Sequence, residues 1–242
     1  VSSVTQGTQS LTFSQANNEL TIQLAQTVVS GTQGEVKITY AGMPPTGNEA
    51  FTQSSHAGTP IIWTLSEPFG ARDWWPCKQS LNDKIDAIDI YLRTPAAMVA
   101  VANGVEQSQI MNGDGTKTTH FKHNYPIPAY LVAIAVTNYQ LYNQTAGTAP
   151  NTFPVVNYLY PETYSTAVSQ LAVTLPIMTL FEEKFGTYPF SNEKYGHAQF
   201  GWGGGMEHTT VSFMGSFSRG LIAHELAHHW FGNKVTCGSW KD

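Results

Sequence analysis

The sequence H-E-L-A-H at residues 224–228 has the residue types and the spacing of a zinc-hydrolase site. It lies in Gly220–Phe231, a segment without proline or internal glycine that is predicted to be helical. On a helix, residues four apart share a face, so His224 and His228 can direct two imidazoles at one ion. Glu225 lies about 100° round the helix from His224, where its carboxylate can reach a water beside the metal without binding the metal itself. Two nitrogen ligands and one carboxylate base predict metal-assisted hydrolysis.

A glycine-rich segment, G-G-G-M-E-H at residues 203–208, comes shortly before this helix and between two predicted strands. It is not a phosphate-binding loop, because no Lys-Ser or Lys-Thr follows the glycines and no helix begins there. One interpretation is a flexible turn. The other is a backbone thin enough to pair edge-on with an extended peptide through Gly204, Gly205 and Met206. Glu207 would then present a carboxylate to a cationic group of the substrate, and a free α-amine in that role restricts cleavage to the first peptide bond.

The composition of the chain excludes several classes of protein. With 242 residues, 41% hydrophobic and 12% charged, it is expected to be globular with a weakly charged surface. A net charge of −5 without a basic cluster argues against nucleic acid as a partner. No apolar run approaches the ~20 residues of a transmembrane span.

The beginning of the chain and its cysteines bear on its origin. No signal peptide begins at Val1 and no initiator methionine is present, so a processed or excised piece is expected. The composition, rich in uncharged polar residues, favours a secreted or periplasmic protein over a cytoplasmic one. Cys77 and Cys237 fit no metal-binding spacing, and two unpaired thiols are expected rather than a disulfide.

Residues 1–143 are predicted to form an all-β domain. Segments that alternate apolar and polar residues are separated by Gly, Asn and Pro, which is typical of half-buried strands. These segments are 11–13, 20–24, 36–40, 61–65, 87–92, 98–102, 117–121 and 130–136. Asn112–Gly115 has the residue types of a hairpin turn. No helical period of useful length appears before about residue 160, so a sandwich-like or saddle-like domain is expected.

Residues 144–242 are predicted to be an α+β unit, and the polar stretch Asn143–Asn151 marks the boundary. One helix is expected over Glu162–Phe185 from its apolar spacing, with Gly186 in the C-cap position. Strands are predicted at 153–160, 197–200 and 210–213. The helix of the zinc motif follows them.

These motifs resemble the aminopeptidase N family of gluzincin metallopeptidases, over a stretch from about residue 60 to the end. Gly204–His208 resembles the G-x-M-E-N exopeptidase motif of the family, with His208 in the Asn position. The sequence H-E-L-A-H-H-W at 224–230 resembles the zinc motif, and F-G-N-K-V-T at 231–236 continues the family pattern. The departure at His208 puts the contact made by the family's Asn in question, but not that of the Glu.

The resemblance implies a role for each of these residues. His224 and His228 would be ligands of one zinc ion, and Glu225 would be the general base. Glu207 would anchor the α-amine of the substrate, beside the backbone of the glycine-rich segment.

A second segment adds to the resemblance. A-R-D-W-W-P-C at residues 71–77 is similar to the family's A-R-x-x-F-P-C, whose upstream Gln or Glu helps to hold the substrate amine. That position falls on Glu67, so Glu67 and Glu207 could converge on one ammonium. Without the resemblance, Glu67 is equally a surface acid ahead of a proline turn.

The third zinc ligand of the family is a glutamate nineteen residues after the second histidine of the motif. Counted from His228, that position lies five residues beyond Asp242, the last residue of the sequence. The resemblance therefore implies the N-terminal part of an aminopeptidase, truncated inside the catalytic domain. Little or no activity and weak or absent zinc binding are expected of this piece alone, because two imidazoles form an incomplete set of ligands.

The expected fold class is a mainly β N-terminal domain of saddle or sandwich type, followed by the start of an α+β thermolysin-like gluzincin catalytic domain that ends just after the H-E-x-x-H helix. The expected function of the intact protein is that of a zinc metallo-aminopeptidase acting on peptides with a free N-terminal amine. The alternatives are a non-catalytic peptide-binding module with a vestigial metal motif, and a zinc endopeptidase. N-acetylated peptides distinguish the two enzymes, since only an endopeptidase cleaves them.

Overall fold

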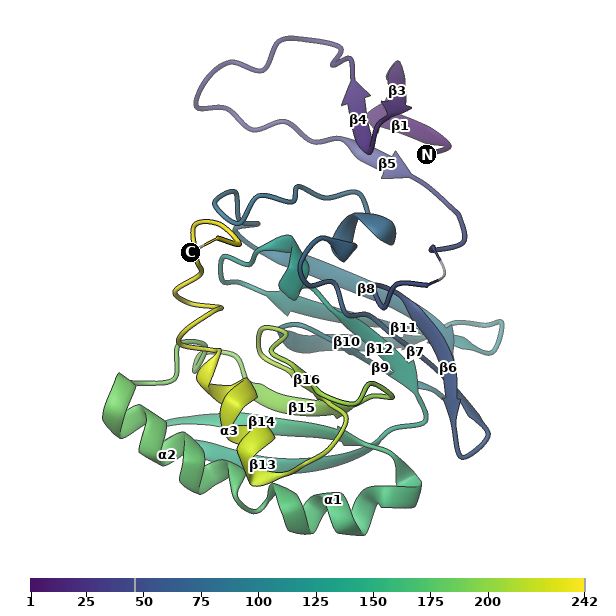
Figure 1. The fold of residues 1–242 in the computed structure, drawn as a ribbon. Coiled ribbons are helices and arrows are strands. Elements are labelled where there is room, and N and C mark those ends of the chain that lie inside the picture. The colour runs from purple at the N-terminus through teal and green to yellow at the C-terminus, as the bar shows by residue number, and fades with distance from the viewer. Residues whose placement is uncertain (46, 242) are drawn as a thin grey trace.

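The computed structural model describes residues 1–45 and 47–241, so Thr46 and Asp242 lie outside the described residues. In Figure 1, small N-terminal strands lie at the top, two larger sheets lie in the middle, and a mixed sheet with helices lies at the bottom. The predicted order, strands first and then strands mixed with helices, is confirmed.

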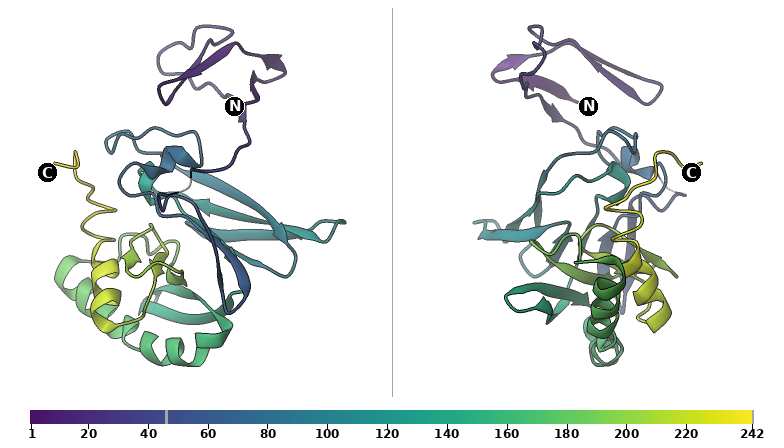
Figure 2. Two further views of the ribbon diagram at one scale, coloured as in Figure 1. Left: turned by 45° about the vertical axis from the view of Figure 1, so that its right-hand side comes forward. Right: turned by 90° about the vertical axis from the view of Figure 1, so that its left-hand side faces the viewer.

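The N-terminal strands form two small antiparallel units that stand apart from the rest of the chain in both views of Figure 2. The sheet β2-β1-β5 contains β1 (Ser3–Gln6), β2 (Gln9–Ser10) and β5 (Lys37–Thr39), and the hairpin contains β3 (Phe13–Ala16) and β4 (Glu19–Ile22). Among residues 1–45, only Val4 and Leu11 have buried side chains. These strands therefore contribute little to the core that positions the site.

Two sheets form the middle of the molecule. The four-stranded sheet has the order β6 (Thr52–His56), β7 (Thr59–Trp63), β12 (Ile134–Thr137), β9 (Val99–Ala102), and the three-stranded sheet has the order β10 (Val105–Met111), β11 (Thr116–His123), β8 (Ile88–Pro95). The predicted turn at Asn112–Gly115 joins β10 to β11. Segment 130–136 is not one strand, because a 3-10 turn at Ala129–Leu131 precedes β12. The Leu131 amide donates to the Pro128 carbonyl (3.1 Å), which closes this turn.

A five-stranded mixed sheet carries the site. Its order is β13 (Gln140–Thr148), β14 (Asn151–Leu159), β15 (Tyr195–Gln199), β17 (Ser212–Met214), β16 (Gly205–Met206). The three central strands run parallel, and each edge strand pairs antiparallel with its neighbour. The strand of the glycine-rich segment, β16, therefore lies at an edge of the sheet.

The long helix predicted for 162–185 is divided. A 3-10 turn (Pro161–Thr163) leads into α1 (Tyr164–Leu171), and α2 (Thr174–Phe185) begins after a break. Pro176 explains the break, because its ring would collide with the carbonyl of Ala172 in a continuous helix and its nitrogen has no hydrogen to donate. Gly186 ends α2 at a φ of 88°, and its amide donates to the Glu182 carbonyl (3.0 Å), as the predicted cap requires.

The helix of the zinc motif is α3 (Arg219–Ala227). Ser218 caps its N-terminus, because the Ser218 hydroxyl accepts a hydrogen bond from the Leu221 amide (3.3 Å). The helix is shorter than the predicted Gly220–Phe231, since the chain passes into tight turns after Ala227. The backbone of His228 is still helical (φ −56°, ψ −25°), so the spacing between the two histidines is kept.

Two hydrophobic cores meet at the site. The first joins the middle sheets to the mixed sheet and includes Trp63, Leu131, Met206 and Phe213. The second lies between the mixed sheet and the helices, and its members include Leu159, Leu171, Met178, Met214, Ile222 and Leu226. The glycine-rich segment and α3 are therefore held by different cores on adjoining strands.

Two further features concern the organisation of the chain. The division into domains at residues 143 and 144 stays a prediction; it falls within β13, which pairs with β14 from Gln140 onward. Among residues 1–45 and 47–241, no single helix is long and apolar enough to cross a membrane, although the bent pair Pro161–Leu171 and Thr174–Phe185 meets both criteria together.

Candidate active site

The two histidines of α3 face one another across one turn of helix. Nε2 of His224 and Nε2 of His228 are 3.1 Å apart, and the rings meet at 86°. Nδ1 of His228 lies 3.2 Å from the Phe231 carbonyl, so this nitrogen carries the hydrogen and Nε2 keeps its lone pair. Both histidines are at least partly exposed. The two Nε2 atoms thus lie side by side at one face of the helix.

This geometry fits two ligands of one zinc ion. Two nitrogens bound tetrahedrally at the usual zinc–nitrogen distance lie about 3.3 Å apart, close to the separation of the two Nε2 atoms. The bond from His228 to a backbone carbonyl is the support that metal-bound histidines ordinarily have. Within residues 1–45 and 47–241, no group of three or more His, Cys, Asp or Glu side chains is arranged to hold a metal.

Glu225 is buried between α3 and the glycine-rich segment. It is 3% exposed, and its carboxylate lies against the backbone of Gly205, where an added Cβ would come within 2.3 Å of Oε1. The close approach requires glycine or a shifted carboxylate. Burial, followed by the charges of Glu207 and Glu67, raises the pKa of Glu225 to about 8.

Glu207 and Glu67 lie close enough to influence this group and each other. Glu207 follows β16 and is 7% exposed, whereas Glu67 is exposed. The pKa of Glu67 is raised by desolvation and then by Glu207, and it is lowered by His228. The structure therefore brings together three acids from three separate segments, as the two motif matches predict. None of the three carboxylates forms an ion pair or hydrogen bond with another described residue.

The glycine-rich segment offers backbone rather than side chains. Gly205 and Met206 pair with Met214 and Phe213 of β17, and the opposite edge of β16 has no neighbouring strand among the described residues. The side chain of Met206 is 2% exposed and belongs to the core, so only its backbone can contact a ligand. The Gly204 carbonyl accepts a hydrogen bond from the Gly215 amide (2.8 Å), which fixes the turn.

Asn233 connects the two halves of the site, and sequence reasoning missed it. Its backbone amide donates to the His228 carbonyl (3.0 Å), while its side-chain amide donates to the Glu207 carbonyl (2.8 Å). The buried Asn233 thus ties the turn after α3 to the glycine-rich segment. The only signal in the sequence was its place in the F-G-N-K-V-T pattern.

Two more residues near the acids have unexpected surroundings. Tyr130 is buried, and its pKa is raised by desolvation and then by Glu207 and Glu67, which places its hydroxyl among the same acids. His208 is fully buried with its ring 4.4 Å from that of Phe213, and neither ring nitrogen has a hydrogen-bond partner among the described residues. Burial lowers the pKa of His208 to about 3, so this ring is neutral.

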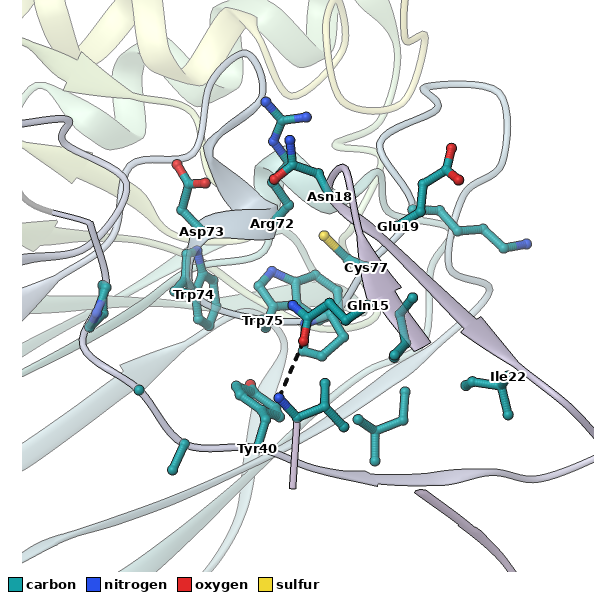
Figure 3. A pocket seen from close by; sticks show the side chains of 18 of the residues that line it. Gln15, Asn18, Glu19, Ile22, Tyr40, Arg72, Asp73, Trp74, Trp75 and Cys77 are labelled. Atoms are coloured by element: carbon teal, nitrogen blue, oxygen red, sulfur yellow. Dashed lines mark hydrogen bonds between the residues drawn. The ribbon is translucent and has the colours of Figure 1, made fainter. Parts of the chain in front are cut away.

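A large cavity lies elsewhere in the molecule. It measures about 780 Å³ and is bounded by the N-terminal strands and residues 72–78, as Figure 3 shows. Its wall includes Arg72, Trp75 and the free thiol of Cys77, whose pKa is raised to about 11 by burial. None of the predicted site residues lines it. Cys237 is also a free thiol, as expected.

Comparison with protein families gives two matches. Residues 2–131 match the Peptidase M1 N-terminal domain, and residues 215–242, which contain the H-E-x-x-H motif, match the Peptidase family M1 domain.

Named relatives are aminopeptidases. Leucine aminopeptidase 2 of Vanderwaltozyma polyspora is 29% identical over 202 residues, which cover 78% of this chain and 28% of the relative. Glutamyl aminopeptidase of Rattus norvegicus is 29% identical over 200 residues, covering 75% of this chain and 21% of the relative. The chain therefore spans only 21% to 28% of the length of these curated relatives.

The fold is shared with a solved structure. The M1 zinc metallopeptidase of Deinococcus radiodurans superposes with a TM-score of 0.82 at 24% identity, over all of this chain and 56% of that one. A mutant of the same enzyme bound to a Tyr-Ser-Ala substrate has a TM-score of 0.82 at 23% identity. The predicted fold class, a mainly β N-terminal domain followed by the start of a catalytic domain, is confirmed.

Proposed function

The chain belongs to the M1 family of peptidases, and we propose that the whole protein is a zinc aminopeptidase that releases residues from the N-termini of peptides. The names of its relatives, leucine and glutamyl aminopeptidases, support this class of reaction. His224 and His228 would hold the zinc ion, and the family's spacing assigns its third ligand to a position beyond residue 242. The bound ion would supply a Lewis acid that polarises the scissile carbonyl and acidifies water.

One observation carries the proposal: three acids that have no cationic partner among the described residues gather near the motif helix. Glu207 and Glu225 are buried, and burying carboxylates that repel each other is unfavourable unless positive charge joins them. A metal ion at the histidines and an ammonium group at Glu67 and Glu207 would supply that charge. An α-ammonium held there marks the first peptide bond of the substrate as the bond to be cleaved.

The three acids divide the chemistry between them. Glu225 neighbours both metal ligands, so its carboxylate would take a proton from the attacking water and return it to the nitrogen of the leaving amine. Glu207 and Glu67 would bind the α-ammonium through charge-assisted hydrogen bonds, which fixes the substrate along the site. The open edge of β16, at Gly205 and Met206, would pair with the substrate backbone as an added strand.

Replacing the amine anchor tests the proposal most directly. In the full-length protein, Glu207→Gln should lower kcat/KM for an aminoacyl chromogenic substrate by about a hundredfold, since a buried ammonium–carboxylate contact is lost. Zinc content, measured by atomic absorption, should be unchanged because Glu207 is not a ligand. Equal loss of zinc and activity would contradict the assigned role.

Acetylated peptides separate the alternatives with the same preparation. An aminopeptidase should spare an N-acetylated peptide and cleave its free form, because acetylation removes the charge that the acids recognise. Cleavage of both forms would indicate a zinc endopeptidase. Binding of the free peptide without any cleavage would indicate a peptide-binding module.

The 242 residues alone should behave differently from the full-length protein. We expect little or no hydrolysis of the chromogenic substrate, since two imidazoles without a third protein ligand bind zinc weakly. Robust turnover by this chain in added zinc would contradict the assignment of the third ligand to a later position.

A further inference from the structure

Four residues form one row across the mixed sheet beneath α3. Tyr142 on β13 pairs in register with Asn157 on β14, Asn157 with His197 on β15, and His197 with Ser212 on β17. Residues paired in register project to the same face of a sheet. Asn157, His197 and Ser212 are all completely buried. A buried row of polar side chains is costly unless every member is bonded.

Hydrogen bonds connect the buried polar side chains of this row and continue, through Tyr195, to His229, which follows α3. Nδ1 of His197 lies 2.7 Å from Oδ1 of Asn157, and Nε2 of His197 lies 3.2 Å from the hydroxyl of Tyr195. That hydroxyl lies 3.2 Å from Oγ of Ser212, which lies 3.3 Å from Nε2 of His229. His229 directly follows the ligand residue His228. We call Asn157, His197, Tyr195, Ser212 and His229 the polar row.

One end of the polar row sets the direction of its hydrogen bonds. The side-chain amide of Asn157 donates to the Tyr142 carbonyl (3.0 Å), so its Oδ1 accepts the hydrogen of Nδ1 of His197. Burial lowers the pKa of His197 to about 3, so this ring is neutral and its Nε2 can only accept. Tyr195 therefore donates to His197.

The same direction continues to α3. The hydroxyl of Ser212 donates to that of Tyr195, and Nε2 of His229 donates to Ser212. Nδ1 of His229 then accepts from the hydroxyl of Tyr188 (3.0 Å), whose single hydrogen is shared with the Lys194 carbonyl (3.3 Å). The hydroxyls of Tyr195 and Ser212 each accept one hydrogen bond and donate one, and the rings of His197 and His229 are held in single tautomers.

We propose that the polar row is a positioning device for the zinc ligand His228. His229 directly follows His228 in the turn after α3, so holding the ring and backbone of His229 against the sheet also holds the adjoining backbone of His228. Because a second bond ties Nδ1 of His229 to Tyr188, its ring cannot turn or slide along the sheet. The residues of the row thereby hold Nε2 of His228 toward Nε2 of His224. The inference rests on the proposed zinc-binding function of these two histidines.

A matched pair of tyrosine variants tests the inference in the full-length protein. Tyr195→Phe removes the central hydroxyl of the row. Tyr139→Phe removes a hydroxyl of another buried tyrosine, which donates to the Gln199 carbonyl (2.6 Å) and forms no hydrogen bond with the polar row among the described residues. Zinc affinity is measured by titrating Zn²⁺ against a chromophoric chelator, and stability is measured by thermal unfolding of the zinc-free protein. Tyr195→Phe should weaken zinc binding by about tenfold or more, the usual effect of losing an outer partner of a metal ligand.

The control and a second variant make the result decisive. Tyr139→Phe should lower the melting temperature about as much as Tyr195→Phe does, while its zinc affinity stays within about twofold of that of the unsubstituted protein. Ser212→Ala, which changes volume little, should repeat the loss of affinity even where Tyr195→Phe folds poorly. Unchanged zinc affinity in Ser212→Ala, or equal losses of zinc affinity in Tyr195→Phe and Tyr139→Phe, would overturn the inference. His224→Ala serves as the reference: unchanged zinc binding in that variant would overturn the proposed function instead.

Discussion

Acidic side chains at two places in this molecule have opposite surroundings. Glu193 is 6% exposed, and its carboxylate lies 2.6 Å from Nδ1 of His123 and 2.6 Å from the backbone amide of Asn124. Lys194 adds a buried ammonium that donates to the Ala102 carbonyl (3.2 Å). We call these four residues, His123, Asn124, Glu193 and Lys194, the paired cluster. Glu67, Glu207 and Glu225 form the open cluster, which has no such partners among the described residues.

The two clusters differ in whether partners within the fold balance their charges. In the paired cluster, donors within the fold offset the cost of burial, so removing one member leaves another unsatisfied. In the open cluster, like charges face each other and the balancing charge must come from outside the described chain. The first arrangement stabilises the fold. The second fits the proposed binding of a metal ion and of an ammonium group. Substitutions should therefore have opposite consequences in the two clusters.

The largest effect is expected at Glu225. In the full-length protein, Glu225→Gln should reduce kcat by about a thousandfold or more, because the general base is lost. The free energy of unfolding should stay level or rise slightly, since a neutral amide replaces a buried carboxyl whose ionised form is disfavoured. Steady-state kinetics and urea unfolding measure the two quantities. A large loss of stability would show that the open cluster is structural after all.

The reverse pattern is expected at Glu193. Glu193→Ala should lower the free energy of unfolding by about 3–5 kcal/mol, the usual cost of breaking a buried pair. The exposed Glu183 on α2 is the matched control, and Glu183→Ala should change stability by less than about 0.5 kcal/mol. Similar values for the two variants would remove the distinction between the clusters.

The pH dependence of the free energy of unfolding should reveal the contribution of Lys194. Burial lowers the pKa of Lys194 from 10.5 to about 8, against the raising influence of Glu193 and Glu106. Between these pH values the unfolded chain binds more protons, so this group makes stability rise with pH by at most about 1.4 kcal/mol per unit. Lys194→Met should abolish that contribution. Urea unfolding of both proteins at about pH 7 and about pH 9.5 measures it, and parallel pH profiles would contradict the expectation.

The smallest effect is expected at Glu67, the exposed member of the open cluster. Glu67→Gln should raise KM for the chromogenic substrate about two- to fivefold and leave kcat nearly unchanged, because an exposed ion pair contributes at most about 1 kcal/mol. Glu49, also exposed, provides the control substitution. A change as large as that of Glu207→Gln would mean that Glu67 is desolvated by the bound peptide.

Local patterns in the sequence predicted local structure well. The turn at Asn112–Gly115, the cap at Gly186 and the motif helix all depend on residues within a few positions of each other. The helix break before α2 was missed although Pro176 was its signal, because the apolar spacing continues across it. The strand predicted at 130–136 failed for a similar reason: an apolar run does not distinguish a turn from a strand.

Contacts between distant segments could not be predicted in this way. The polar row depends on the register of three strands, β14, β15 and β17, and a shift of one residue in any of them would turn its side chain to the other face. The bonds of Asn233 to His228 and Glu207 likewise depend on how a turn packs against an edge strand.

The sequence by itself determined how the proposed site residues of α3 lie relative to one another, because helix geometry places His224, Glu225 and His228 without help from the rest of the chain. Only the tertiary structure decided what surrounds them. It brought Glu67 and Glu207 from separate segments close to Glu225, and it connected His229 to the polar row across the sheet. The physical reason is range: a helix is specified by neighbours along the chain, whereas electrostatic coupling and strand register are specified by packing.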